Sequence, residues 1–277
     1  MFKKYLQNGL IGATAVVLVG ARVVPGTEQN GPVIMAAAKV VAGGDSIRAE
    51  RALNATAVVA RATENTVMLN TNSALAAFES SVRTLSHPKA LETAFRSYYA
   101  YKSAHPNDVK KPYLYFVDYG LASTEPRGYV FDMDNMTIVD GPFTVAHGRG
   151  SSSSQYGVPT RFSNNSGAAT TSLGLYLTQE TYAFSGHAAG TLYHSIGLRL
   201  QGLSRGWNDN ARARGVVAHG APYVTPTKAG RSQGCPAMEQ ARAERLLPKL
   251  ANGSMVFLFA PNQDWMKDDP WVVASTN

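Results

Sequence analysis

The pattern of apolar residues changes at Pro112, and this change limits the possible folds more than any other feature of the sequence. After it, short runs rich in Val, Phe, Tyr and Leu alternate with turn residues, which is typical of a β-rich domain. The runs that we expect to form strands are residues 114–117, 129–131, 137–139, 143–145, 198–200, 216–219 and 255–259. No repeat of fixed period and no second change of composition follows, so one main domain is predicted.

Two stretches have helical periodicity. Within residues 73–104, apolar positions follow Pro88 at spacings of three and four, and Pro suits the first turn of a helix. A second helix is predicted from Pro236 to about residue 247. The chain has 277 residues, of which 44% are hydrophobic and 16% charged, enough for a buried core and too apolar for disorder. We therefore predict a β-rich α+β fold with a few helices.

The N-terminus has the order of a secretory signal. Lys3 and Lys4 precede an apolar run at residues 10–19, and small residues follow at Gly20 and Ala21. A transmembrane helix needs about 20 apolar residues, and this run ends earlier. We predict a signal peptide at residues 1–21, a variable and partly helical lead-in at 22–85, and the main domain at 86–277. The mature protein would be periplasmic or associated with the cell wall, without a stable membrane span.

Charge and cysteine content exclude several classes of protein. Lys and Arg outnumber Asp and Glu by 26 to 19, which gives a net charge of +7, but the basic residues are scattered, so no nucleic-acid partner is expected. Cys235 is the single cysteine, which excludes an internal disulfide and a multi-cysteine metal site. Metal-ligand and dinucleotide-binding motifs do not occur, so we predict neither metal nor cofactor.

Cys235 is the residue most suited to chemistry. It precedes Pro236 at the predicted helix start, and a helix N-terminus stabilises the reactive thiolate. Gly234 permits a tight turn in which its N–H and that of Cys235 face a developing oxyanion. His219 ends a predicted strand and is the candidate general base. The alternative for Cys235 is an inert buried thiol, which is disfavoured in an oxidising compartment. The alternative for His219 is a strand histidine with a structural role only.

A serine nucleophile is the competing interpretation of the same stretch. Gly230, Ser232 and Gly234 match the G-x-S-x-G motif of α/β-hydrolases. In those enzymes the catalytic histidine follows the serine, whereas no histidine follows His219 in this chain. Ser232 is therefore excluded as the nucleophile. His147, which also precedes a glycine at a strand end, is the second candidate for the base.

Six motifs in the same order resemble the murein L,D-transpeptidase catalytic-domain family. They are VAHG at 145–148, RFSN at 161–164, SLG at 172–174, NDNA at 208–211, VAHGA at 217–221 and GRSQGCP at 230–236. The resemblance implies a β-sandwich-like catalytic domain and acyl transfer through a cysteine. It implies Cys235 as the nucleophile and His219 as its base. Gly220 would orient the imidazole through its carbonyl, and Ser232 and Gly234 would shape the oxyanion side.

The same resemblance implies a peptidoglycan stem tetrapeptide as the donor substrate. The thiolate would attack the carbonyl between the L-centre of the diamino acid and the terminal D-Ala, and a second stem's amine would resolve the thioester to a 3-3 cross-link. Carbapenems are the implied inhibitors. The widespread motif has a hydrophobic residue and then Arg or Asn after the cysteine, whereas this chain has Pro236 and Ala237. The remaining candidates for substrate binding are Arg231, Arg214, Asn210 and His147.

Two other functions remain open at the level of sequence. An L,D-carboxypeptidase or endopeptidase would use the same site, with water in place of the acceptor amine. A non-catalytic protein that binds the cell wall would keep the fold without a reactive thiol.

Overall fold

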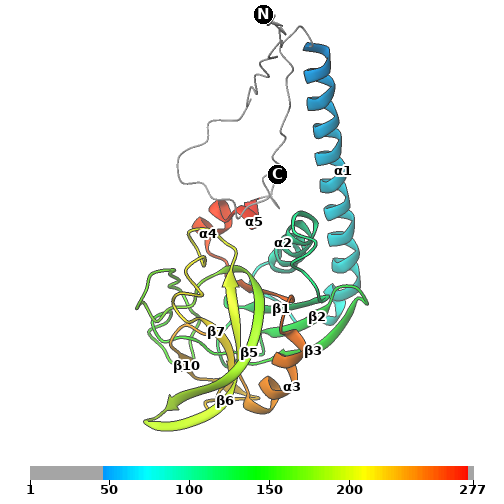
Figure 1. Cartoon of the computed structure of the whole chain (residues 1–277). Coiled ribbons are helices and arrows are strands. Elements are labelled where there is room, and N and C mark those ends of the chain that lie inside the picture. The colour runs from blue at the N-terminus through cyan, green and yellow to red at the C-terminus, as the bar shows by residue number, and fades with distance from the viewer. Residues whose placement is uncertain (1–45, 274–277) are drawn as a thin grey trace, which may run out of the picture. The chain divides into compact units, whose positions relative to one another are not determined.

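A mixed sheet of eight strands lies at the centre of the fold (Figure 1). The computed structural model describes residues 46–273. In spatial order the strands are β11 (Ala237–Met238), β7 (Val217–Gly220), β6 (Thr191–Gly202), β5 (Gly174–Ala188), β12 (Met255–Phe259), β1 (Tyr113–Asp118), β2 (Gly128–Asp132) and β3 (Thr137–Phe143). The pairs β1–β12 and β7–β11 are parallel, and the other neighbours are antiparallel.

Two short strand pairs lie beside this sheet. β4 (His147–Gly148) pairs in parallel with β10 (Arg231–Ser232), and β8 (Val224–Thr225) pairs with β9 (Lys228–Ala229). The first pair joins two segments more than 80 residues apart, both of which carry predicted site residues.

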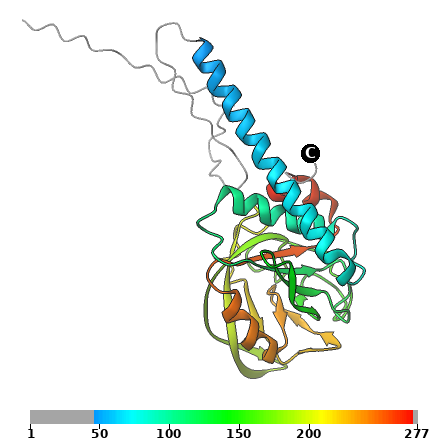
Figure 2. The same ribbon diagram turned by 90° about the vertical axis from the view of Figure 1, so that its right-hand side faces the viewer.

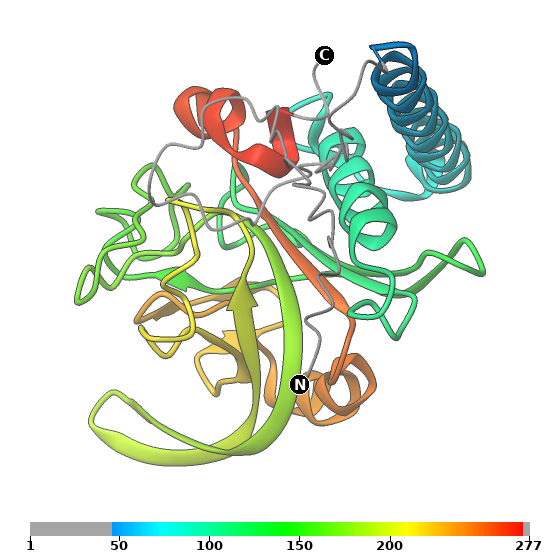
Figure 3. The same cartoon turned by 45° about the horizontal axis from the view of Figure 1, so that its top comes forward.

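The helices differ in what they cover. α2 (Ala90–Ala104) contacts β1, β12 and α5 (Pro270–Val273), and α5 contacts α4 (Gln263–Asp268) (Figures 2 and 3). α3 (Gln240–Leu250) packs instead on β6 and β7. α1 (Ser46–Phe78) is followed by a short 3-10 helix (Glu79–Ser81).

The chain divides into two compact units, and α1 belongs to both. Residues 46–64 are the described part of the first unit, and none of their described side chains is buried. The second unit begins at Asn65 and includes the rest of α1. There Val67, Ala74 and Phe78 recur at helical spacing and are buried in the core.

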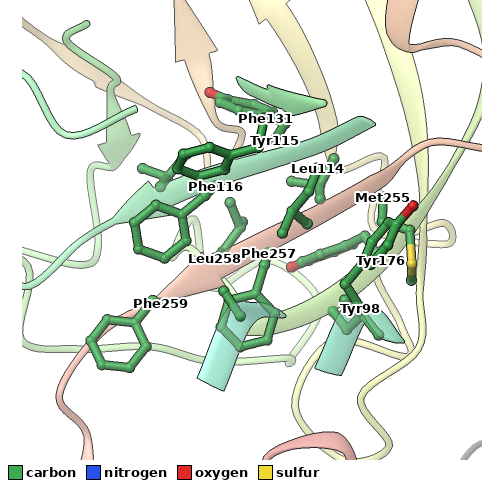
Figure 4. Packing of buried hydrophobic residues seen from close by; sticks show 14 of the residues in the cluster. Tyr98, Leu114, Tyr115, Phe116, Phe131, Tyr176, Met255, Phe257, Leu258 and Phe259 are labelled. Carbon is green, nitrogen blue, oxygen red and sulfur yellow. The ribbon is translucent and has the colours of Figure 1, made fainter. Parts of the chain in front are cut away.

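The core is built around the two central parallel strands. All five residues of β12 and five of the six in β1 are buried, so both faces of these strands are covered. Figure 4 shows Leu114 and Phe116 of β1 beside Phe257 and Phe259 of β12, with Tyr98 of α2 close by.

The predicted fold class, β-rich α+β with a few helices and a helical N-terminal region, is confirmed. Strands form where they were expected at 114–117, 129–131, 198–200, 216–219 and 255–259. The strand expected at 137–139 is part of β3 (Thr137–Phe143), whereas of the strand expected at 143–145 only Phe143 is in a strand, the last residue of β3. The helical stretch at 73–104 is interrupted, since α1 ends at Phe78 and α2 begins at Ala90.

The helix predicted to start at Pro236 is wrong in its first turn. Residues 237–238 form β11 and pair with β7, and α3 begins only at Gln240. Pairing with a neighbouring strand satisfies the backbone here, so the segment has no need of helical hydrogen bonds. Cys235 therefore does not lie at a helix N-terminus.

Most of the β5–β6 hairpin was not predicted from the sequence. The two strands pair from Tyr176 and Gly202 to Ala188 and Thr191, with a register shift between Thr178 and Thr181. The outer part of the hairpin reaches away from α2, α4 and α5 (Figure 3). Its residues are mostly exposed or half-buried, so they lack the continuous apolar run by which a buried strand is found.

The predicted signal peptide at residues 1–21 lies outside the described residues. Within residues 46–273, no helix combines the length and the apolar character needed to cross a membrane.

Candidate active site

The parallel pairing of β11 with β7 brings the cysteine segment to the histidine strand. Ala237 lies opposite His219, and Cys235 is two residues before Ala237. Cys235 is half-buried, and its Sγ lies 3.9 Å from the carbonyl oxygen of Gly215. The backbone of Val217 also forms a hydrogen bond with the thiol. The short segment that leads into β7 therefore lines the sulfur and carries the histidine.

The surroundings of His219 define which ring nitrogen is basic. Its side chain is buried, and Nδ1 lies 3.0 Å from the carbonyl oxygen of Gly220. Because a carbonyl only accepts hydrogen bonds, Nδ1 carries the proton and Nε2 keeps its lone pair. Phe184 of β5 stacks on the imidazole with ring centroids 4.2 Å apart. Burial lowers the pKa of His219 to about 4, although the bond to Gly220 opposes this shift.

The thiol is neutral in the same environment. Burial raises the pKa of Cys235, while the hydrogen bond from Val217 and the charge of Arg214 lower it. A neutral thiol and a neutral imidazole are therefore the resting forms at neutral pH. In such a pair the proton leaves the sulfur as the sulfur attacks, and a basic Nε2 suits that role.

Ser232 closes a tight turn around the cysteine. Its Oγ accepts the N–H of Gly234 at 3.1 Å and donates to the carbonyl oxygen of Cys235 at 2.7 Å. Gly234 has φ +128°, and a Cβ there would lie 2.7 Å from the carbonyl oxygen of Thr170, so this turn requires glycine. The Gly234 N–H is engaged within the turn. Among the hydrogen bonds of the described residues, none uses the N–H of Cys235.

His147 lies next to this turn, but its ring carries the proton on the other nitrogen from that of His219. It pairs with Arg231 in the β4–β10 ladder and is completely buried, with Nδ1 3.1 Å from Nη2 of Arg127. Because a guanidinium only donates, Nδ1 accepts and Nε2 carries the proton. Burial, with the charges of Arg127 and Arg231, lowers the pKa of His147 to about 3. Its Nε2 is thus a donor, and the geometry favours His219 over His147 as the base.

Arg127 holds His147 in place. This guanidinium is fully buried and donates to the carbonyl oxygens of Val145 at 2.7 and 3.0 Å and Leu121 at 2.6 Å. It also stacks over the ring of Tyr119, 4.7 Å from the centroid. Desolvation lowers the pKa of Arg127 to about 10, so the group is still charged at neutral pH.

The remaining predicted substrate-binding residues differ in exposure. Arg231 is exposed, with one long hydrogen bond of 3.4 Å to the carbonyl oxygen of Ser152. Arg214 is half-buried and bound to backbone and hydroxyl oxygens. Asn210 is also exposed and bonds to Asn164 through its backbone N–H at 3.1 Å and its amide at 3.4 Å. Asn210 thereby joins the NDNA and RFSN motifs.

Three residues that shape this region were missed in the sequence. Phe184 lies in the unrecognised hairpin, Arg127 follows a turn-like Glu-Pro pair, and Thr170 lies in a polar loop. Each acts through a partner distant in the chain, so no local spacing marks it.

The family of the chain follows from its sequence. A sequence model of the L,D-transpeptidase catalytic domain matches residues 83–259. The chain belongs to the L,D-transpeptidase catalytic-domain family. Its match includes the cysteine turn, both His-Gly pairs and the Arg214 segment. No protein of curated function matches the chain in a sequence search.

Solved L,D-transpeptidases are similar to this chain at low identity. One from Mycobacterium smegmatis is 13% identical with a TM-score of 0.32, and the match covers 54% of this chain and 59% of that one. One from Stackebrandtia nassauensis is 15% identical with a TM-score of 0.34, covering 62% and 66%. A third, in complex with imipenem, is 12% identical with a TM-score of 0.31, covering 53% and 59%. The chain thus spans less than two thirds of the length of each of these proteins.

Proposed function

We propose that this L,D-transpeptidase family member is an exported cysteine acyltransferase that acts on peptidoglycan stem peptides and forms 3-3 cross-links. The observation that carries the proposal is the β7–β11 register, which places the turn of Cys235 against the strand of His219. The hydrogen bond from Nδ1 of His219 to Gly220 supports Nε2 as the base. Membership of the family supports the peptidoglycan substrate.

The first half of the reaction releases D-Ala. Cys235 Sγ bonds to the carbonyl carbon of the diamino acid, the π electron pair moves to the carbonyl oxygen, and the thiol proton passes to Nε2 of His219. The free N–H of Cys235 stabilises the oxyanion. The tetrahedral intermediate then collapses: the C–N bond breaks, D-Ala takes the proton from His219, and a thioester is left on Cys235.

The second half transfers the acyl group. The side-chain amine of a second stem attacks the thioester carbonyl and gives a proton to His219. The C–S bond breaks, and the thiolate of Cys235 regains that proton. Water in place of the amine would give hydrolysis by the same steps, so access of the acceptor decides between transpeptidase and carboxypeptidase.

Among the predicted substrate-binding residues, Arg231 is the one we assign to a carboxylate of the donor peptide. Its guanidinium is exposed beside Ser232, and a guanidinium binds a carboxylate by paired hydrogen bonds. His147 would support this wall of the site through its pairing with Arg231, and Asn210 would lie at its rim. Carbapenems would acylate Cys235, as the imipenem complex of a related structure suggests.

We also propose the division of the chain that the sequence indicates. Residues 1–21 would direct export, 22–85 would form the lead-in, and 86–277 would be the catalytic domain in the periplasm or at the cell wall. Detection of a mature N-terminus at residue 22 by mass spectrometry would support this arrangement, and an intact N-terminus in the secreted fraction would contradict it.

The decisive experiment is product analysis by mass spectrometry. Mature protein is incubated with purified disaccharide-tetrapeptides beside a Cys235→Ala control. Loss of D-Ala together with a dimer linked between two diamino acids supports the transpeptidase, and the control should produce neither. Loss of D-Ala without a dimer would replace the proposal by a carboxypeptidase. Unchanged substrate in both samples would favour the non-catalytic protein that binds the cell wall.

A further inference from the structure

Arg214 makes an unusual set of contacts for an arginine beside a reactive thiol. Its guanidinium donates to the carbonyl oxygens of Ser163 at 2.8 Å and Thr170 at 3.0 Å, and to the hydroxyl of Ser172. All three acceptors belong to one loop, residues 163–172, which we call the clamp loop. None of the ion pairs found among the described residues includes Arg214. Its positive charge is therefore not neutralised by a neighbouring carboxylate.

The clamp loop contacts the cysteine turn through the carbonyl oxygen of Thr170, which accepts a hydrogen bond from Arg214. A Cβ placed on Gly234 would lie 2.7 Å from the carbonyl oxygen of Thr170 and 3.8 Å from Nη2 of Arg214. The carbonyl oxygen of Thr170 thus lies close to Gly234 and at the same time accepts a hydrogen bond from the guanidinium of Arg214. A shift of this carbonyl would displace the backbone of Gly234 and with it Cys235.

The position of Arg214 in the chain adds to this effect. Gly215, whose carbonyl lies 3.9 Å from Sγ, is the next residue, and the turn there has φ +70° at Gly215. Val217, which bonds to the thiol, and His219 follow directly. The segment that carries the base is therefore anchored at Arg214 to the loop that supports the nucleophile.

We propose that Arg214 is a positioning residue, which fixes the cysteine turn through Thr170 and keeps a positive charge near Cys235 Sγ, rather than a ligand of the substrate carboxylate. This inference rests on the proposed function of Cys235. A cation held near the sulfur stabilises the thiolate that forms in the reaction. Arg231, which is exposed, is left for the carboxylate.

The test compares Arg214→Gln, Arg214→Lys, Arg231→Gln and, as a control, Arg205→Gln, which removes an exposed charge from the same region. The rate of Cys235 alkylation by iodoacetamide is measured against pH. This readout needs no substrate, so it remains valid if the proposed activity is absent. We expect Arg214→Gln to raise the alkylation midpoint by about one pH unit, and Arg214→Lys to raise it less because the charge is kept. The control and Arg231→Gln should leave the midpoint within about 0.2 units of wild type.

Kinetics with the tetrapeptide separate the two arginines further. Both Arg214 variants should lower kcat about tenfold or more with little change in KM, whereas Arg231→Gln should raise KM. If Arg214→Gln fails to fold, Ser172→Ala removes one acceptor of Arg214 and should shift the alkylation midpoint in the same direction by a smaller amount. An unchanged midpoint in Arg214→Gln or, in its place, in Ser172→Ala would overturn the proposal. A KM effect in Arg214→Gln like that in Arg231→Gln would also overturn it.

Discussion

The stacking of Phe184 on His219 predicts how the proposed catalytic base titrates. The rings lie 4.2 Å apart and 19° from parallel, and the histidine is 3% exposed. Burial lowers the pKa of His219 from 6.5 to about 4, a difference of about 3.4 kcal/mol between the protonation states at 1.36 kcal/mol per unit. Phe184→Ala removes the cover from one face of the imidazole.

We expect Phe184→Ala to restore part of the hydration that the imidazole of His219 loses on burial. Phe184 covers one of two ring faces, so the pKa of His219 should rise by about one unit, equivalent to about 1.4 kcal/mol. Phe184→Leu, which keeps apolar atoms over the ring, should raise it by less than half as much. At pH 5 the wild-type imidazole is about nine-tenths neutral, whereas that of Phe184→Ala would be about half neutral.

Proton NMR of the histidine Cε1–H resonances measures this directly. The His219 signal is identified by its absence in His219→Gln, and its midpoint is followed from pH 3 to 8. If activity is found, the acid limb of kcat/KM should move with the midpoint. A wild-type midpoint near 6.5 would refute the burial argument, and an unchanged or lower midpoint in Phe184→Ala would refute the role of the stacked ring.

Two further substitutions test the packing around the site. Gly234→Ala should cost about 1–3 kcal/mol in the free energy of unfolding and most of the activity, because it combines positive φ with a contact to the Thr170 carbonyl. The control is Gly190→Ala, at φ +83° in open space, which should lower the free energy of unfolding less and leave the activity unchanged. Equal urea midpoints for Gly234→Ala and Gly190→Ala would contradict the clash with Thr170. Arg127→Leu should cost about 3 kcal/mol or more in a urea titration, because the buried carbonyls that it serves lose their donor. A loss below about 1 kcal/mol would show that those carbonyls find other partners.

Some of the site could be predicted from the sequence because its signals are local. A single cysteine flanked by Gly234 and Pro236, and a histidine at the end of an apolar run, are visible without a fold. The strands around residues 114–117 and 255–259 were also predictable, because a strand buried on both faces is a continuous apolar run. The six ordered motifs indicated the family because each of them is a short, local stretch of sequence.

The chemical state of these residues was decided by the tertiary structure. The predicted helix start at Pro236 was replaced by β11, since pairing with β7 satisfies the same backbone groups. The sulfur is lined by Gly215 and Val217 and not by a helix terminus. Sequence spacing does not contain this information, because it depends on strand register between segments that are distant in the chain.

The order of residues therefore specifies which side chains are available for chemistry, whereas folding sets their protonation and their surroundings. Two histidines each precede a glycine at a strand end, and the sequence could only rank them. In the fold, the Gly220 carbonyl leaves Nε2 of His219 basic, whereas Arg127 leaves Nε2 of His147 protonated. The physical reason is that a tautomer follows from the donor or acceptor that folding places at the other ring nitrogen.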